Sequence, residues 1–470
     1  MNRRDIRTFL DNWTLRKCAR DMTIHGVPQL ARAHAPQWLT AVWAGVIGCF
    51  MLLCLYMEAK TVLLYLEYRS VVNIHTSDEG PLLMPTVTIC NFNTLKKSAV
   101  LEKYPEYYHI LSGENADDQA MNATNSTWVN INSQRPILDG LLDMSFELED
   151  LLLSCRLKLD ESKLLSQADC AEYFEPRRTT DGVCYSFHTQ AYIDAHGPLV
   201  VQQGSIEQSV QFVLHAQPHE YLPADRFGSG FRVAVHDVGT QSNIDVDAVM
   251  VATGFQTFIG LQRQTTQRLS TPYTSTPCLD NSDLRDDKYS VEECNFNCSM
   301  SMAYDCGDCS WEAQNCTMRH LPCITSNLAN NVALRSRCSC PRLCRHSGYD
   351  KQVSSIKLPH AATGVTPPHA FQLLLPPNTS IADDIAIVHV YFRSTSVTTT
   401  EHVPAMNVQQ LFAQIGGQLG LFLGASFVSC TECVEMIVVV IARRVTRRWK
   451  TTPTTTATTN DDETEKLPKY

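Results

Sequence analysis

Two long apolar stretches interrupt an otherwise polar chain. The first, from Trp38 to Met57, reads "WLTAVWAGVIGCFMLLCLYM" and carries no charged residue. A helix of that length and composition can cross the hydrocarbon core of a bilayer. The pattern predicts a membrane helix over residues 38–66.

The second uncharged run extends from about Val403 to Thr431, is interrupted by Glu432 and Glu435, and resumes as "MIVVVIA". It is long enough to cross a bilayer in spite of the two carboxylates. We therefore expect a second membrane helix over residues 403–442.

Basic residues flank the two spans and predict their orientation. Seven arginines and lysines precede the first span, and "RRVTRRWK" follows the second. Because cytoplasmic flanks are enriched in Lys and Arg, both tails, residues 1–37 and 443–470, are expected in the cytoplasm. Residues 67–402 then lie outside the cell.

The region between the spans mixes two periodicities. "LMPTVTICNFN" alternates as a half-buried strand does, and short β-like runs recur from Cys184 to Gly260 and again before the second span. Residues 95–165 are more helical, with "LDGLLDMSFELEDLLLSC" amphipathic. The fold class expected is an α+β membrane protein with a β-core in the outer region.

Composition narrows the function. The chain has 470 residues and a net charge of −10, which argues against a basic nucleic-acid binder. No nucleophile–base constellation and no phosphate-binding loop stands out in the sequence, so neither an enzyme nor a cofactor is expected.

Cysteines and glycosylation motifs support the topology independently. Fourteen of the 19 cysteines fall in the outer region, an even number that suits a disulfide framework. The densest part, residues 278–344, is too poor in apolar residues to build much core of its own. Acceptor motifs for N-glycosylation lie in the same region, at Asn122, Asn125, Asn297, Asn315 and Asn378.

Two Cys-x-x-Cys motifs invite a zinc or redox interpretation. "CGDC" at 306–309 lies among the other outer cysteines, where disulfides are favoured over metal. "CTEC" at 430–433 has no nearby ligand quartet. No metal site is expected.

Several motifs resemble one family. In order they are "IHGV" (24–27), "TICNFN" (88–93), "GFQTFIGLQ" (254–262), "CSCPRLC" (338–344) and "GGQLGLFLGAS" (416–426). The chain resembles the degenerin/epithelial sodium channel superfamily, and its acid-sensing ion channel branch most closely.

The resemblance implies a trimer in which each subunit has two membrane helices and a disulfide-rich extracellular domain of finger, thumb, palm and knuckle type. Residues 278–344 would be the thumb. The implied disulfides are Cys90–Cys184, Cys155–Cys170, Cys278–Cys344, Cys294–Cys340, Cys298–Cys338, Cys306–Cys323 and Cys309–Cys316.

Glycines in the second span have two interpretations. Gly416 and Gly420 have the four-residue spacing of close helix packing. Alternatively, Gln414, Gly417, Leu421 and Gly424 form one stripe of a pore-lining helix.

The resemblance favours the pore. Gly424, Ala425 and Ser426 match the selectivity filter, where backbone carbonyls could replace the hydration shell of sodium if the helix unwinds. Ala413 matches a position that requires a small side chain for closure.

Two further groups acquire a meaning from the resemblance. Glu432 and Glu435 share a helix face; they either extend to the membrane boundary or form an anionic inner vestibule that gathers cations. His25 and Gly26 are a plain turn or, as in the family, a gating motif at the inner pore. Tyr68 and Tyr273 are the candidates for coupling the first span to the thumb.

The gating stimulus is where the chain departs from its relatives. "Tyr68-Arg69-Ser70" replaces the histidine of acid-sensing members, and "ITSNLANNVALRSR" after Cys323 has no carboxylate. A crowded carboxylate pocket senses pH because like charges raise each other's pKa, and that cluster is missing. Other groups remain as proton sensors: His215, His219, His236 and Glu401.

The sequence thus predicts a subunit of a sodium-selective, amiloride-sensitive channel of the plasma membrane. It would form a homotrimer or a heterotrimer with related subunits, contact membrane lipid, and open to protons or another extracellular ligand such as a peptide. Constitutive opening is the alternative within the family. A two-span receptor that conducts nothing is the alternative of another class.

Overall fold

The structure, a computed structural model, describes residues 19–32, 35–112, 134–158, 163–179, 182–223, 228–280, 289–329, 338–359 and 369–450. The chain divides into two compact units. Residues 1–70 with 404–470 form one, here called the helical unit, and residues 71–403 form the other, the sheet unit.

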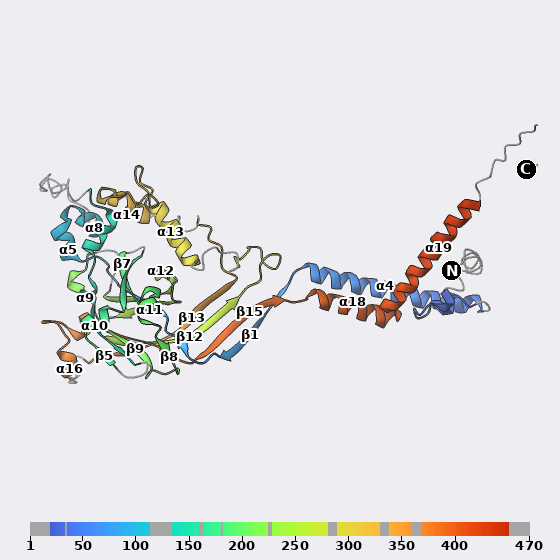
Figure 1. Ribbon diagram of the computed structural model, residues 1–470, viewed down its shortest axis with the longest axis horizontal. Coiled ribbons are helices and arrows are strands. Elements are labelled where there is room, and N and C mark those ends of the chain that lie inside the picture. The colour runs from blue at the N-terminus through green and yellow to red at the C-terminus, as the bar shows by residue number, and fades with distance from the viewer. Residues whose placement is uncertain are drawn as a thin grey trace, which may run out of the picture. The chain divides into compact units, whose positions relative to one another are not determined.

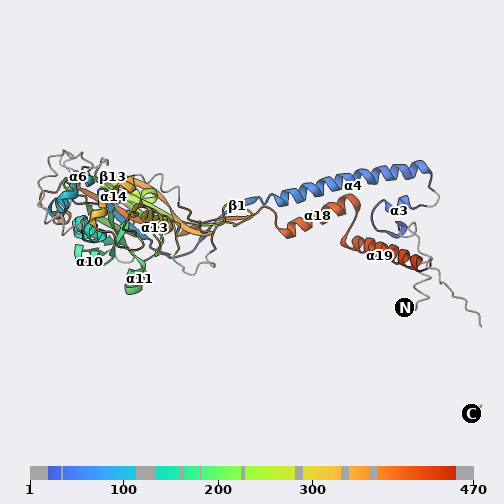
Figure 2. The same ribbon diagram turned by 90° about the horizontal axis from the view of Figure 1, so that it is seen from above.

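The helical unit contains α3 (Val27–Leu30), α4 (Gln37–Leu66), α18 (Val408–Leu423) and α19 (Phe427–Lys450). Helices α4 and α18 lie side by side, as Figures 1 and 2 both show. Among the described helices, α4 is the one long and apolar enough to cross a membrane by length and composition, so the first predicted span is one continuous helix.

The second predicted span is not one continuous helix. It is divided into α18 and α19, and the chain turns between them at residues 424–426 (Figure 2). The turn arises because Gly424 adopts a left-handed conformation, with φ 61° and ψ 21°, that ends α18.

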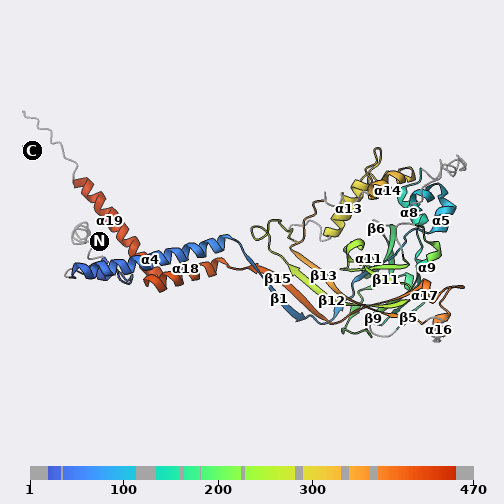
Figure 3. The ribbon, with the colours of Figure 1, turned by 180° about the vertical axis from the view of Figure 1, so that it is seen from behind.

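The sheet unit is built on two large sheets, whose long strands are seen best in Figure 3. The eight-stranded sheet has the order β1-β15-β12-β14-β9-β4-β5, with β13 paired to β12. Its strands are β1 (Ser70–Asp78), β15 (Ser396–Pro404), β12 (Phe255–Gln267), β14 (Ile385–Phe392), β9 (Ser209–His215), β4 (Leu152–Leu157), β5 (Lys163–Leu165) and β13 (Arg345–Lys357).

The five-stranded sheet has the order β11-β10-β3-β7-β6, and β2 pairs with β8 separately. These strands are β11 (Val249–Ala252), β10 (Gly230–His236), β3 (Thr86–Asn91), β7 (Gly182–Phe187), β6 (Phe174–Thr179), β2 (Leu82–Leu83) and β8 (Val200–Val201). The main core lies among these sheets, where the Phe187 and Phe212 rings meet edge to face with centroids 5.2 Å apart.

Strand β3 corrects the prediction of a half-buried strand. All six of its residues are buried because both faces of the strand are covered: Val87 and Ile89 lie in the main core, and Cys90 packs with Ile244 in a separate cluster. The polar side chains that suggested an exposed face are hydrogen-bonded instead: Thr88 Oγ1 lies 2.8 Å from Ser186 Oγ, and Thr86 Oγ1 donates to the His188 carbonyl. Threonine can satisfy a buried hydroxyl in this way, so alternation did not mean exposure.

The amphipathic segment before Cys155, expected to be helical, is helical only in its first part. The segment divides into α8 (Ile137–Met144), α9 (Leu148–Leu151) and strand β4. Strand β4 pairs with β9 on one side and β5 on the other, and nearly all of its residues are buried. Long-range pairing overrides local helical preference here.

Short helices cover the sheets. They are α5 (Lys97–Lys103), α6 (Tyr108–Ser112), α10 (Gln167–Ala171), α11 (Gln190–His196), α12 (Ile244–Asp247), α13 (Val291–Ala303), α14 (Leu321–Ala329), α16 (His369–Gln372) and α17 (Ile381–Asp384), with 3-10 turns at Pro105–Tyr107, Pro218–Glu220 and Met318–His320. The cysteine-dense part shares a second core with α5 and α8: Met300, Tyr304 and Met318 pack with Tyr104 and Ile137.

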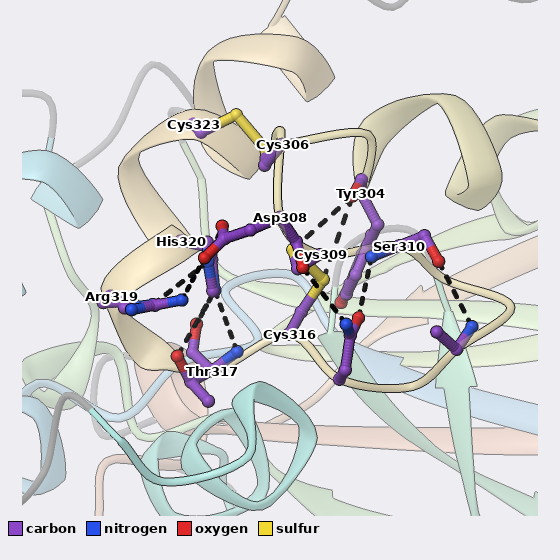
Figure 4. Close-up of a disulfide and its surroundings, with 12 residues drawn as sticks. Tyr304, Cys306, Asp308, Cys309, Ser310, Cys316, Thr317, Arg319, His320 and Cys323 are labelled. Atoms are coloured by element: carbon purple, nitrogen blue, oxygen red, sulfur yellow. Dashed lines mark hydrogen bonds and ion pairs between the residues drawn. A yellow bond between two sulfur atoms is a disulfide. The ribbon is translucent and has the colours of Figure 1, made fainter.

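Seven disulfides join the described cysteines of the sheet unit, and they are the seven pairs that the family resemblance implies. Figure 4 shows two of them, Cys306–Cys323 and Cys309–Cys316. Beside these bridges Asp308 pairs with Arg319 and accepts from His320 Nε2 at 2.9 Å. "CGDC" is therefore a disulfide framework, and the described residues contain no cluster that could hold a metal.

Candidate functional site

The site is the break between α18 and α19 and the segment that packs against it. Helix α18 begins at Asn407, whose side chain accepts from Gln410 N at 2.7 Å while Gln410 Oε1 accepts from Asn407 N at 2.9 Å. This reciprocal capping box sets where the helix starts.

The end of α18 requires glycine for two separate reasons. The positive φ of Gly424 is costly for any residue with a Cβ. A Cβ built there would also lie 1.7 Å from His25 Nδ1. The amide of Gly424 donates to the Gly420 carbonyl at 3.0 Å, which closes the last turn as helix-ending glycines do.

Helix α19 begins again after a link of three residues. Ser426 and Ser429 cap it reciprocally: Ser429 N donates to Ser426 Oγ at 3.3 Å, and Ser426 N donates to Ser429 Oγ at 3.1 Å. The carbonyl oxygens of Gly424 and Ala425 accept no hydrogen bond from any residue that the structure describes. The link therefore holds two unused backbone acceptors between two helices.

The His25-Gly26 motif packs directly against this link. His25 N donates to the Leu423 carbonyl at 3.0 Å, using one of the acceptors left over at the end of α18. Gly26 has φ 88° and precedes α3, and a Cβ there would lie 2.9 Å from the Ile47 side chain of α4. The structure thus brings the two predicted motifs into contact.

The two glutamates have different surroundings. Glu432 Oε2 accepts from Thr23 N at 2.9 Å and from Thr23 Oγ1 at 3.1 Å. Glu435 is exposed and forms no hydrogen bond or ion pair with a described residue. Glu432 therefore anchors the segment that carries His25, whereas the Glu435 carboxylate is exposed.

Thr23 and Ser429 were not among the predicted site residues. Their hydroxyls lie 2.8 Å apart, and Ser429 is almost fully buried. Both belong to stretches with a predicted role, beside "IHGV" and "CTEC", but a lone hydroxyl carries no signal of its own.

The predicted pore stripe lies on the face of α18 that α4 does not cover. Ala413, Gln414, Gly417 and Leu421 are all exposed, and Leu421 is 80% exposed. On the covered side, Gln418 Nε2 donates to Thr61 Oγ1 of α4 at 2.9 Å, and Phe422 contacts Phe50. Gly416 and Gly417 have no neighbour within 4 Å of an added Cβ, so none of the described helices packs against them.

The remaining predicted residues are placed individually. Tyr68, with φ 48°, ends α4 in the helical unit, and Tyr273 belongs to the sheet unit. Their coupling stays a prediction. Asn297, Asn315 and Asn378 are exposed in the sheet unit, whereas Asn122 and Asn125 lie outside the described residues.

Two of the candidate proton sensors are buried. His236 Nε2 lies 2.9 Å from Thr88 Oγ1, and burial lowers the pKa of His236 to about 4. Burial also lowers the pKa of His215, against the opposing charge of Asp384. Both imidazoles are neutral at neutral pH, so neither changes its charge readily on mild acidification.

The comparisons with known proteins identify similar channels. The chain is 25% identical over 445 residues to acid-sensing ion channel 4-B of Danio rerio, covering 89% of this chain and 75% of that protein. It is 25% identical over 459 residues to acid-sensing ion channel 1 of Gallus gallus, covering 89% and 82%.

A solved proton-activated chloride channel aligns with a TM-score of 0.32 at 7% identity, over 87% of this chain and 98% of that one, and this likeness is too slight to bear on the fold. The family model described as amiloride-sensitive sodium channel matches residues 18–436, from before the His25-Gly26 motif to beyond Glu435. The chain therefore belongs to this family of trimeric cation channels, and it is a channel subunit rather than an enzyme.

Proposed function

We propose that the chain is one of three subunits around a sodium-selective pore of the plasma membrane, with residues 424–426 as the selectivity filter. The observation that carries the proposal is the break between α18 and α19, where the Gly424 and Ala425 carbonyls have no hydrogen-bond donor among the described residues. Unpaired backbone at membrane depth is tolerated where it lines a water-filled path.

The chemistry of these carbonyls suits a partly dehydrated cation. A sodium ion that sheds water needs oxygen ligands in its place, and rings of carbonyls are a known solution. Three copies of the link around one axis would present repeated sets of such oxygens. The His25 segment and Glu432 support the link from the side, through Leu423 and Thr23.

The exposed stripe of α18 supports assembly around a central path. A single chain leaves Ala413, Gln414, Gly417 and Leu421 without cover. In a trimer this face would line the pore above the filter, with Glu435 below it as an anionic site that gathers cations. Both tails would then be cytoplasmic and the sheet unit extracellular, as the basic flanks predict.

For the stimulus, we propose an extracellular ligand ahead of protons. The support is that His236 and His215 are buried with lowered pKa values, while the expected carboxylate cluster is missing from the sequence. Protons acting on exposed groups and constitutive opening are the other outcomes. We also propose block by amiloride, and the support for it is the description of the family alone.

The experiment is to record whole-cell current from cells that express this chain alone. External sodium is exchanged for potassium, amiloride is added, and the external solution is stepped from about pH 8 to about pH 5, the range over which ordinary histidines titrate. A current that reverses near the sodium potential supports the proposal. Current that appears on acid steps would show that protons, and not another ligand, are the stimulus. Current already present at rest would indicate a leak channel.

A chain that reaches the cell surface but conducts neither ion would oppose the pore. The absence of current in that experiment would have two explanations: the chain conducts only beside a different subunit, or it is a two-span receptor. Co-expression with an acid-sensing relative separates them, because a Gly424 variant should change the selectivity of a mixed channel and leave a receptor unaffected.

A further inference from the structure

A polar cavity in the sheet unit lies apart from every residue discussed as pore, filter or gate. It has a volume of about 190 Å³ and lies between α13, strand β6 and the segment 241–244 that follows β10. Thr88 of β3 also lines it. The cavity is therefore enclosed by the five-stranded sheet and by one helix of the cysteine-dense part.

The cavity contains a guanidinium without a partner. Arg177 lies on β6, the edge strand of its sheet, and is half-buried. It forms no hydrogen bond or ion pair within the described ranges, although Glu293 and Glu175 are near enough to influence it. Burial lowers the pKa of Arg177 because the charge is only partly solvated. A partly buried guanidinium in this position favours an anion with two oxygens.

The same cavity also contains a carboxylate without a partner. Glu292 lies in the first turn of α13 and lines the cavity, but it makes no ion pair or hydrogen bond with the residues described. The lining of the cavity thus carries one positive and one negative group. A site for a simple anion or a simple cation would need only one of them.

Unsatisfied polar groups and an apolar wall complete the lining. Ser242 Oγ is buried with no hydrogen-bond partner, and the Asn295 amide forms none with any described residue. Ile244 and Phe296 supply apolar surface. A buried polar group is normally paired, so the unpaired Ser242 hydroxyl, beside the half-buried Arg177, Glu292 and Asn295, leaves hydrogen-bonding capacity for an occupant of the cavity.

A larger cavity of about 470 Å³ adjoins the first and shares Gln241, Ser242 and Glu292 with it. Glu292 therefore lies where the two cavities meet.

We propose that this cavity binds a small zwitterion of the α-amino acid class with an aliphatic side chain. The carboxylate pairs with Arg177, the ammonium group pairs with Glu292, and the side chain lies against Ile244 and Phe296. Ser242 and Asn295 complete the hydrogen bonds. The proposal does not depend on conduction, since binding can be measured on a chain that passes no current.

The test uses the full chain, purified in lipid nanodiscs, and three matched probes in calorimetric titrations. L-leucine has both charges, 4-methylpentanoate lacks the ammonium group, and 3-methylbutylamine lacks the carboxylate. We expect saturable binding of L-leucine, with each analogue at least about tenfold weaker because one charged hydrogen bond is lost.

Two variants test which charged side chain binds which charged group of L-leucine. Arg177→Gln should weaken L-leucine and 4-methylpentanoate about tenfold or more and leave 3-methylbutylamine unchanged. Glu292→Gln should weaken 3-methylbutylamine and leave 4-methylpentanoate unchanged. Arg156→Gln, on β4 away from the cavity, is the control and should bind L-leucine as the wild type does.

Three results would overturn the proposal. The first is the absence of saturable L-leucine binding to the wild-type chain, which would mean that water fills the cavity. The second is L-leucine binding that neither Arg177→Gln nor Glu292→Gln weakens. The third is equal binding of all three probes.

Discussion

The helical unit and the sheet unit are stabilised in different ways. In the sheet unit seven disulfides surround cores of fully buried side chains such as Phe187, Phe212 and Phe231. In the helical unit few side chains are buried at all, and the described cysteines Cys49, Cys54 and Cys433 are free.

This contrast indicates which contacts stabilise each unit. The sheet unit buries its apolar surface within one chain, whereas α4 and α18 leave large apolar side chains exposed, as a helix facing lipid or other subunits does. Within the helical unit α4 and α18 pack side by side, and a few polar contacts fix the α18–α19 link.

The largest expected effect comes from the link. Gly424→Ala must place a Cβ in a left-handed conformation, at about 1–2 kcal/mol, and against His25. We expect sodium current or sodium selectivity to fall about tenfold or more from the strain alone. Whole-cell current measures the loss, and surface labelling should show normal delivery.

The matched control for this substitution is Gly416→Ala. Gly416 is helical and has no neighbour within 4 Å of an added Cβ, so current and selectivity should be kept. Equal behaviour of the two variants would mean that the conformation at Gly424 is not important for permeation.

The next effect concerns the disulfides of the sheet unit. Replacing Cys278 and Cys344 by serine opens the outermost bridge of a nested set. Because Cys294–Cys340 stays joined, the loop released comprises only residues 278–294 and 340–344, and the free energy of unfolding should fall by about 3 kcal/mol from chain entropy. Replacing Cys309 and Cys316 opens a separation of 7 and should cost about 2 kcal/mol. Tryptophan fluorescence during denaturation measures both, and the reverse order would contradict the loop-entropy account.

Acid should destabilise the sheet unit through His236. Its pKa is about 4 in the folded chain against 6.5 when free, so the unfolded chain takes up the proton first as the pH falls. Stability is full above pH 6.5 and declines toward pH 4, by up to about 3 kcal/mol at 1.36 kcal/mol per pKa unit.

The pH dependence of the unfolding midpoint tests this prediction. His236→Gln should flatten the acid limb of that curve. His75→Asn, on the exposed strand β1, should leave the acid limb unchanged. An acid limb that is equally steep in both variants would assign the effect to other groups.

The smallest effect is expected between α4 and α18. Thr61→Val and Gln418→Leu each break the hydrogen bond between these helices. Polar pairs of this kind in membranes are worth about 0.6 kcal/mol, so a double-mutant cycle on thermal stability in nanodiscs should return a coupling near that value. A coupling of several kcal/mol would mean that this contact, and not lipid or other subunits, holds the helical unit together.

Much of the fold could be predicted because local patterns report local environments. The absence of charge from Trp38 to Met57 was sufficient to predict α4, and the short β-like runs after Cys184 became β7, β9, β10 and β12. The break in the second span could be foreseen from Gly424, since glycine adopts a left-handed conformation at little cost.

The failures share one cause. Strand β4 and the fully buried strand β3 depend on which strands pair with them, and those partners lie far along the chain. The pattern of polar and apolar residues along one segment indicates how polar each position is. It does not specify which distant segment packs against that position.

By itself, the sequence determined the two apolar stretches, the composition of the link and the even number of cysteines between the two stretches, because length, charge and residue type act locally. Only the tertiary structure decided that His25 lies against Gly424, that Thr23 holds Glu432 from 409 residues away, and that Arg177 and Glu292 share one cavity. The physical reason is that these contacts depend on how distant segments pack, and no periodicity of a single segment specifies its partner.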